Sequence, residues 1–311
     1  TDSHHIGRII INPNNSDEVI VGSIGHLYSP NKERGIYKTI DGGKTWTNKL
    51  FIDENTGIID IETAPNNFNV MYAAAWERER KAWNFVGSGT NSAIYKSIDG
   101  GETWKSVSDN GFPTGSGVGR IGLAVYDENT VYALHDSQFE FEDNSNRRNS
   151  RAPDPIALNE EAFHTMTSEE FVNLDDKEID NYLKSLGFHE KYRAHNIKNF
   201  VQSNALSPGE VPAFLQSNQA VTAAAVTGAE VFMSTNGGKS WKKKNTENLS
   251  LYSSYGYYFG ESRVDHQDKN GLYILGISLL KSKDGGATFS SISKENVHSD
   301  HQAFWVNPKR S

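Results

Sequence analysis

The sequence contains no cysteine, no long hydrophobic run and no excess of basic residues. The lack of cysteine excludes disulfides, thiol nucleophiles and cysteine-ligated zinc. No run of about 18 apolar residues is present, so we expect no membrane-spanning helix. The 31 basic and 39 acidic residues give a net charge of −8, which argues against a nucleic-acid partner, because phosphate binding requires a positive surface.

The rest of the composition is that of a folded chain. Hydrophobic residues make up 36% and aromatic residues 11% of the 311 positions, so the chain is neither low-complexity nor collagenous. The first five residues, Thr1–His5, show no basic segment followed by an apolar one. We therefore expect that any export signal was removed or lies on a longer precursor.

An eight-residue motif occurs four times. Each copy contains a hydroxyl residue, an Asp or Asn, two glycines and an aromatic residue, and the copies are Thr39–Trp46, Ser97–Trp104, Ser234–Trp241 and Ser282–Phe289. The Asp or Asn side chain can accept turn amides, and glycine can adopt a positive φ. The motif therefore predicts a strand, a tight turn and a second strand. The residues that receive a structural role in these turns are Asp41, Asp99, Asn236 and Asp284.

A second pair of strands is predicted before each motif. The first strand of each pair lies in one of the runs Gly7–Ile11, Ile58–Glu62, Gly119–Val125 and Arg263–His266. Each run is followed by a polar turn and a further apolar run. Four antiparallel strands per unit is the composition of a propeller blade. We therefore predict an all-β propeller with about four blades present, as part of a larger propeller.

One gap between the motifs holds an insertion. The motif acids or amide lie at positions 41, 99, 236 and 284, so the middle gap is far longer than the others. Its helical periodicity, with Asp175 and Glu178 as a capping box and Gly187 as a stop signal, predicts a small and mostly helical segment. The predicted domains are 1–137 (two blades and half of a third), 138–218 (the insertion) and 219–311 (the remainder, with the first strand of a further blade).

The motif Ser/Thr-x-Asp-x-Gly-x-Thr-Trp resembles the Asp-box, or bacterial neuraminidase repeat, over nearly the whole chain outside the insertion. The phrases Gly25–Tyr28, Ala75–Phe85 and Val297–Ala303 resemble the secreted sortilin-like repeat proteins of Bacteroidetes, which are commonly labelled glycosyl hydrolases by analogy. The resemblance implies a secreted or cell-surface propeller that binds protein or glycan, with the remaining blades on a longer chain. It also implies that the Asp-box acids are folding elements remote from the central pocket.

We expect a ligand site at the mouth of the central channel, which the innermost strands line. Three arginines occupy the same place in their units, and aligning Pro13 with Pro65 puts an aspartate at the equivalent position. The candidate ring of mixed charge consists of Arg8, Asp60, Arg120, Arg263, Asp265 and His301. Such a ring suits a carboxylate, a sugar or a peptide terminus. An inter-blade salt-bridge network is the alternative, because Arg often serves as a structural fork for carboxylates.

The loop 76–85 is a second candidate binding surface. It contains two Trp, one Phe, two Glu, two Arg and one Lys. We nominate Trp76, Arg78 and Trp83 as ligand-binding residues, because Trp can stack on a sugar face or an apolar side chain while Arg binds a carboxylate. A long inter-strand loop with Trp76 in the core explains the same residues, and both interpretations stay open.

A glycoside hydrolase is the alternative to a binding scaffold. A xyloglucanase-type reaction requires two facing carboxylates, for which Asp60 and Asp265 are the inner-strand candidates. A sialidase would use three Arg and a Tyr paired with a Glu, but the Arg-Ile-Pro motif is absent and only the tyrosines near Glu261 resemble that pair. An enzyme should lose turnover when either Asp is replaced, whereas a scaffold has none to lose.

We expect no metal and no cofactor from the sequence. His298 and His301, with Asp300, supply metal-ligand types but lack a distant third ligand. The run Gly115–Gly119 precedes a strand and has no following Lys-Ser/Thr and helix, so it is a blade loop and not a phosphate-binding loop.

Overall fold

The computed structural model describes two compact units. The described residues are 3–81, 85–140, 158, 160–185, 194–204, 206–212, 214–215, 226–247, 249, 251, 256–294 and 296–309. One unit is Thr1–Glu140 with Val226–Ser311, and the other is Phe141–Ala225. These bounds differ from the predicted 138–218 because one strand continues to Glu140 and the next begins at Val226. Among the described helices, none is long and apolar enough to cross a membrane.

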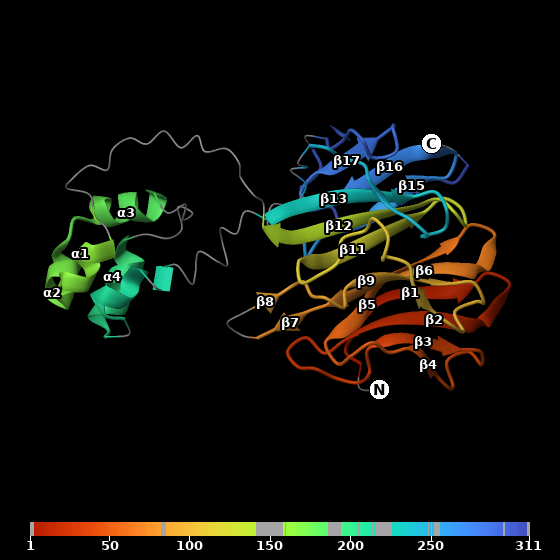
Figure 1. Ribbon diagram of the computed structural model, residues 1–311, viewed down its shortest axis with the longest axis horizontal. Helices are drawn as coiled ribbons and strands as arrows, with labels where there is room; N and C mark the ends of the chain where they lie inside the picture. The colour runs from red at the N-terminus through yellow and green to blue at the C-terminus, as the bar shows by residue number, and fades with distance from the viewer. Residues whose placement is uncertain are drawn as a thin grey trace. The chain divides into compact units, whose positions relative to one another are not determined.

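The first unit contains four antiparallel sheets of four strands each (Figure 1). Blade 1 contains β1 (His5–Asn12), β2 (Asn15–Gly25), β3 (Gly35–Thr39) and β4 (Thr47–Leu50). Blade 2 contains β5 (Thr56–Ala64), β6 (Asn67–Glu77), β9 (Ala93–Ser97) and β10 (Lys105–Ser106). Blade 3 contains β11 (Val118–Val125), β12 (Val131–Glu140), β13 (Val226–Ser234) and β14 (Lys242–Lys243). Blade 4 contains β15 (Ser262–Asp265), β16 (Asp268–Leu275), β17 (Leu279–Ser282) and β18 (Ser290–Ser291).

The strands of every blade are hydrogen-bonded in chain order. A small ribbon of β7 (Glu79–Arg80) and β8 (Phe85–Val86) lies in the chain between β6 and β9. The first strands of successive blades contact one another, β1 with β5, β5 with β11 and β11 with β15. The predicted all-β propeller fold is confirmed.

The four motifs form the turns between the third and fourth strands. In the first copy, Asp41 Oδ1 accepts a hydrogen bond from the Thr45 N–H (2.9 Å) and Oδ2 accepts one from the Thr45 hydroxyl (2.6 Å). These hydrogen bonds lower the pKa of Asp41 to about 2. Gly42 and Gly43 adopt φ values of 71° and 86°, which favour glycine. Asp99 and Asp284 make the same two contacts in their own turns. Asn236 accepts a hydrogen bond from the Ser240 N–H in the same way, but its amide Nδ2 donates to the Ser240 hydroxyl.

Each motif is also tied to the first hairpin of its own blade. In blade 1 the Gly42 N–H donates to the Asp17 carbonyl at 3.0 Å. The equivalent bonds of blades 2, 3 and 4 join Gly100 to Asn69, Gly237 to Asn129 and Gly285 to Asn270. The motif residues are therefore satisfied by local turns, and the opposite end of each blade carries the connections between second and third strands.

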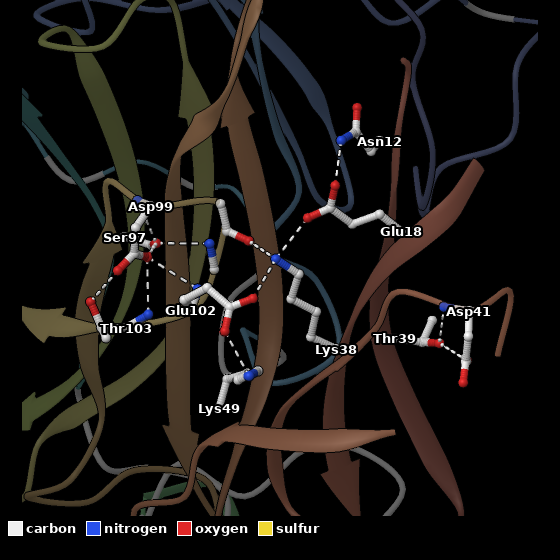
Figure 2. A network of polar contacts seen from close by, with 12 residues as sticks. Asn12, Glu18, Lys38, Thr39, Asp41, Lys49, Ser97, Asp99, Glu102 and Thr103 are labelled. Atoms are coloured by element: carbon white, nitrogen blue, oxygen red, sulfur yellow. Dashed lines mark hydrogen bonds and ion pairs between the residues drawn. The ribbon is translucent and has the colours of Figure 1, made fainter. Parts of the chain in front are cut away.

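Lysine side chains join neighbouring blades at this motif end. Lys38 on β3 reaches the Gly100 carbonyl of blade 2 at 2.8 Å and forms ion pairs with Glu18 (2.7 Å) and Glu102 (2.8 Å), as Figure 2 shows. Lys96 repeats the contact with the Gly237 carbonyl of blade 3 at 3.1 Å. The equivalent lysine contact therefore joins two successive pairs of blades.

The hydrophobic core of the propeller unit lies between blades. Blades 1 and 2 share a cluster that includes Ile20, Ile58 and Met71, all fully buried. Two further clusters join blade 2 to blade 3 and blade 3 to blade 4. Burial of each such side chain contributes about 1.5–3 kcal/mol relative to exposure. Most apolar burial thus depends on neighbouring blades being present together.

The second unit is helical, as predicted for the insertion. Its elements are α1 (Glu160–Thr165), α2 (Ser168–Asn173), α3 (Asp176–Ser185), α4 (Ala194–Gln202) and the 3-10 helix η1 (Pro208–Glu210). Thr167 and Glu170 form a capping box at the start of α2. Phe171, Ile179 and Ile197 belong to a core of the unit's own. The predicted stop residue Gly187 lies outside the described residues.

Candidate functional site

Six charged residues gather where the first strands of the blades meet, and we call them the inner-strand cluster. Its members are Arg8, Asp60, Glu62, Arg120, Glu261 and Arg263. Arg8, on β1, lies 2.6 Å from Asp60, 3.2 Å from Glu261 and 3.7 Å from Glu62. Burial alone would lower the pKa of Arg8, but these three acids raise it above its ordinary value.

Asp60 joins three blades through its two carboxylate oxygens. Oδ1 accepts a hydrogen bond from Arg8 Nε at 2.7 Å, and Oδ2 accepts one from the Leu123 N–H of β11 at 2.9 Å. The residue is 3% exposed. Asp60 on β5 therefore acts as a clamp between β1 and β11, and both of its oxygens already have partners.

Glu62 and Glu261 are acids with opposite pKa shifts. Burial and repulsion from Asp60 raise the pKa of Glu62 to about 8, although 28% of its side-chain surface stays exposed. For Glu261, burial opposes the ionised form, but Arg8, Arg263 and Arg120 outweigh it and lower its pKa. Glu261 lies 2.8 Å from Arg263. Burial thus favours the neutral form of Glu62, whereas the three arginines favour the ionised form of Glu261.

The raised pKa of Glu62 predicts a pH-dependent loss of stability. Between pH 4.5 and about 8 the folded chain keeps a proton that the unfolded chain has lost, so stability falls as pH rises. In Glu62→Gln the free energy of unfolding should fall by roughly 1–2 kcal/mol less over this pH range, a value that is reduced for solvent screening. Urea unfolding of both proteins across this range measures the difference in slope, and identical slopes would contradict the assignment.

The structure brings together four of the six predicted ring residues. Arg8, Asp60, Arg120 and Arg263 all belong to the inner-strand cluster. Arg120 also donates to the Tyr258 carbonyl at 3.0 Å. Whether this cluster binds a ligand stays a prediction, because the same contacts serve as ion pairs between blades.

The other two ring residues lie elsewhere. Asp265 ends β15, where its Oδ1 accepts a hydrogen bond from the Gln267 N–H at 3.0 Å, so it caps the β15–β16 turn. The His301 N–H donates to the Gly276 carbonyl at 2.8 Å beside the β16–β17 connection. In the described part of the chain, Asp265 has no ion pair with the cluster. The nomination of Asp60 and Asp265 as a carboxylate pair stays a prediction.

Sequence reasoning missed Glu62, and it considered Glu261 only as the acid beside the nearby tyrosines of a sialidase-type site. Glu62 follows Asp60 by two positions on β5, which places both side chains on one face of the strand. Glu261 precedes Arg263 by two positions and lies directly before β15. The period-two pattern of each strand was therefore the available signal, whereas the approach of the two acids to shared arginines depends on packing between blades.

The aromatic loop has a buried tryptophan and two half-buried arginines. Trp76 is 3% exposed and donates from Nε1 to the Gly87 carbonyl at 2.8 Å, so its ring is part of the core and is closed to a ligand. Arg78 lies over the Trp76 ring at 5.2 Å, and Arg80 lies over the Phe85 ring at 5.3 Å. The third nominated residue, Trp83, lies outside the described residues.

No metal centre is formed by the described residues. Within the ranges given above, no group of three or more His, Asp or Glu side chains is arranged to hold a metal ion. The four motif residues Asp41, Asp99, Asn236 and Asp284 are engaged in their own turns.

The four blades place the chain among the β-propellers. No family model and no curated protein matches the sequence. Solved structures that are similar include an ancestral GH74 enzyme (13% identity, TM-score 0.46, 95% of this chain and 25% of that chain) and the GH74 xyloglucanase of Xanthomonas campestris (11%, 0.45, 90% and 28%). YCF48 bound to a D1 peptide is also similar (13%, 0.28, 94% and 70%). The chain spans about a quarter of the GH74 chains.

Proposed function

We propose that the chain is a ligand-binding propeller scaffold that takes a protein or glycan ligand at the inner-strand cluster. The surplus of guanidinium groups carries this proposal. Arg8, Arg120 and Arg263 keep 23%, 14% and 25% of their side-chain surfaces exposed. They face three carboxyl groups, and the pKa of one of these, Glu62, is raised by burial, which favours its neutral form. An anionic or polar ligand group can therefore bind to exposed guanidinium edges without displacing a strand.

Two further parts of the proposal rest on the resemblance of the sequence. We place the protein outside the cell or at the cell surface, and we propose that further blades of a longer chain complete the propeller. The ligand site would then share its face with blades outside this sequence.

A glycoside hydrolase is the second candidate, and one observation favours it. Glu62, with a raised pKa, and Glu261, with a lowered pKa, both contact Arg8 and Arg263. Acids whose environments separate their pKa values in this way are suited to act as general acid and as base or nucleophile. Three arginines hold Glu261, however, and this favours a structural role for the acid.

Binding and turnover measurements on the same variants separate the two functions. For a scaffold, we expect ligands from peptide and glycan panels to lose about ten-fold in affinity in Arg263→Gln, because one charge-assisted contact is removed. Lys283→Gln, an equal change of charge at an exposed motif turn, should bind normally. Turnover of oligosaccharides that disappears in both Glu62→Gln and Glu261→Gln would instead establish the hydrolase.

A further inference from the structure

Arg78 is a cation that has no anionic partner among the described residues. Its Nε is buried and forms no hydrogen bond, and within the described part of the chain neither Arg78 nor Arg80 forms an ion pair with a carboxylate. The two acids of the same loop are used elsewhere, because Glu77 accepts a hydrogen bond from the Asn91 N–H (2.8 Å) and Glu79 pairs with Lys81 (2.9 Å). The two acids that flank Arg78 in the sequence, Glu77 and Glu79, therefore do not neutralise its charge.

The charges that act on Arg78 are all positive. Burial lowers the pKa of Arg78, and Arg34, Arg80 and Arg120 lower it further, to about 10. Arg34 is 2% exposed but donates to the carbonyls of His26 (3.1 Å) and Asn55 (3.1 Å). Arg34 is thus satisfied by the backbone, whereas the side-chain contact of Arg78 among the described residues is the Trp76 ring. A partly buried and unpaired charge is costly, and an anion supplied from outside would remove that cost.

Exposed aromatic and apolar side chains lie in the segments that contact Arg34, Arg80 and Arg120. Tyr258 is 58% exposed, and its carbonyl binds Arg120. Tyr28 is 63% exposed and belongs to the segment whose Ser29 carbonyl binds Arg34 at 3.2 Å. Val86, at 43% exposure, follows Phe85, whose ring packs on Tyr257 at 4.7 Å. Tyrosine and arginine together are the composition of a protein-binding hot spot.

We propose that Arg78, with Arg80 and Arg120, forms a site for the carboxylate groups of an acidic peptide segment, with Tyr28 and Tyr258 as its flanking contacts. This inference rests on the proposed binding function and adds the class of partner. The rest of the chain is acidic, with a net charge of −8, so the site is a local positive patch on a negative protein. A short acidic segment fits such a patch, whereas a long polyanion would be repelled around it.

The test measures binding of labelled acetyl-tetraglutamate to the whole chain by fluorescence polarisation. Tetraglutamate should bind, its affinity should fall as salt rises, and tetraglutamine of equal length should not bind. Arg78→Gln should weaken binding about ten-fold or more, Arg78→Lys should restore part of it, and Lys283→Gln should leave it unchanged. The melting temperature of Arg78→Gln should not fall, since the substitution removes an unpaired charge.

Four outcomes would overturn the inference. Wild-type affinity in Arg78→Gln would show that Arg78 does not hold the carboxylate. Tighter binding of tetragalacturonate, with the same dependence on Arg78, would assign the site to acidic glycans instead. If tetraglutamate does not bind, but a ligand from the peptide or glycan panels binds and depends on Arg263, only this inference is wrong. If no peptide or glycan binds at all, the proposed function is wrong as well.

Discussion

Asp60→Ala should destabilise the propeller unit by about 3 kcal/mol, at the lower end of the range for breaking a buried ion pair. The substitution leaves Arg8 without its 2.6 Å partner and the Leu123 N–H without an acceptor. Both groups lie between blades, and Leu123 is fully buried, so water cannot easily replace the lost oxygens. Asp60→Asn keeps one acceptor oxygen without the charge, and we expect it to cost about half as much.

Urea unfolding followed by tryptophan fluorescence reports on the propeller unit and not on the helical unit, because all six Trp lie outside residues 141–225. Glu79→Ala is the matched control. It removes an ion pair with Lys81 in which both side chains are about half exposed, so it should cost less than about 0.5 kcal/mol. An Asp60→Ala protein as stable as this control would show that the clamp between β1, β5 and β11 contributes nothing.

The repeats made much of the fold predictable. A turn that needs two glycines and an Asx side chain has few alternatives, so the four motifs marked the turns between third and fourth strands. The matching phase of the units likewise placed Arg8, Arg120 and Arg263 on first strands that face one another. Repetition is informative here because equivalent residues of each blade make equivalent turns and strands.

The rest of the candidate site depends on contacts between blades, which the spacing of the repeats does not specify. Asp265 was placed beside Asp60 by analogy, but β15 is only four residues long and Asp265 lies at its turn. Bulges interrupt the register of β1 and β5 near Arg8 and Asp60, so counting along the sequence misplaces side chains by one position. Glu62 and Glu261 are 199 positions apart, and only packing between blades brings both to Arg8.

The close approach of blades 3 and 4 predicts a severe effect for a single added methyl group. A Cβ at Gly122 of β11 would lie 1.6 Å from the Gly260 carbonyl oxygen. The carbonyl oxygen belongs to the backbone, and the Cβ is attached directly to it, so neither can rotate away. Gly122→Ala should therefore lower the free energy of unfolding by about 3 kcal/mol or more and move the two inner strands apart. Gly228→Ala is the control, because its Cβ meets nothing within 4 Å and it carries only the strain of φ 75°, about 1 kcal/mol.

The same substitution tests whether the inner-strand cluster depends on blade spacing. Gly260 directly precedes Glu261, which holds Arg8, Arg120 and Arg263 within 2.8–3.7 Å. A shift of the Gly260 backbone would draw Glu261 away from these arginines and leave their charges less compensated. We therefore expect Gly122→Ala to lose ligand binding at the cluster together with stability, as measured by tryptophan-detected urea unfolding and by the panel affinities. Normal stability and affinity in Gly122→Ala would mean that blades 3 and 4 tolerate separation, and the cluster would then not need its observed geometry.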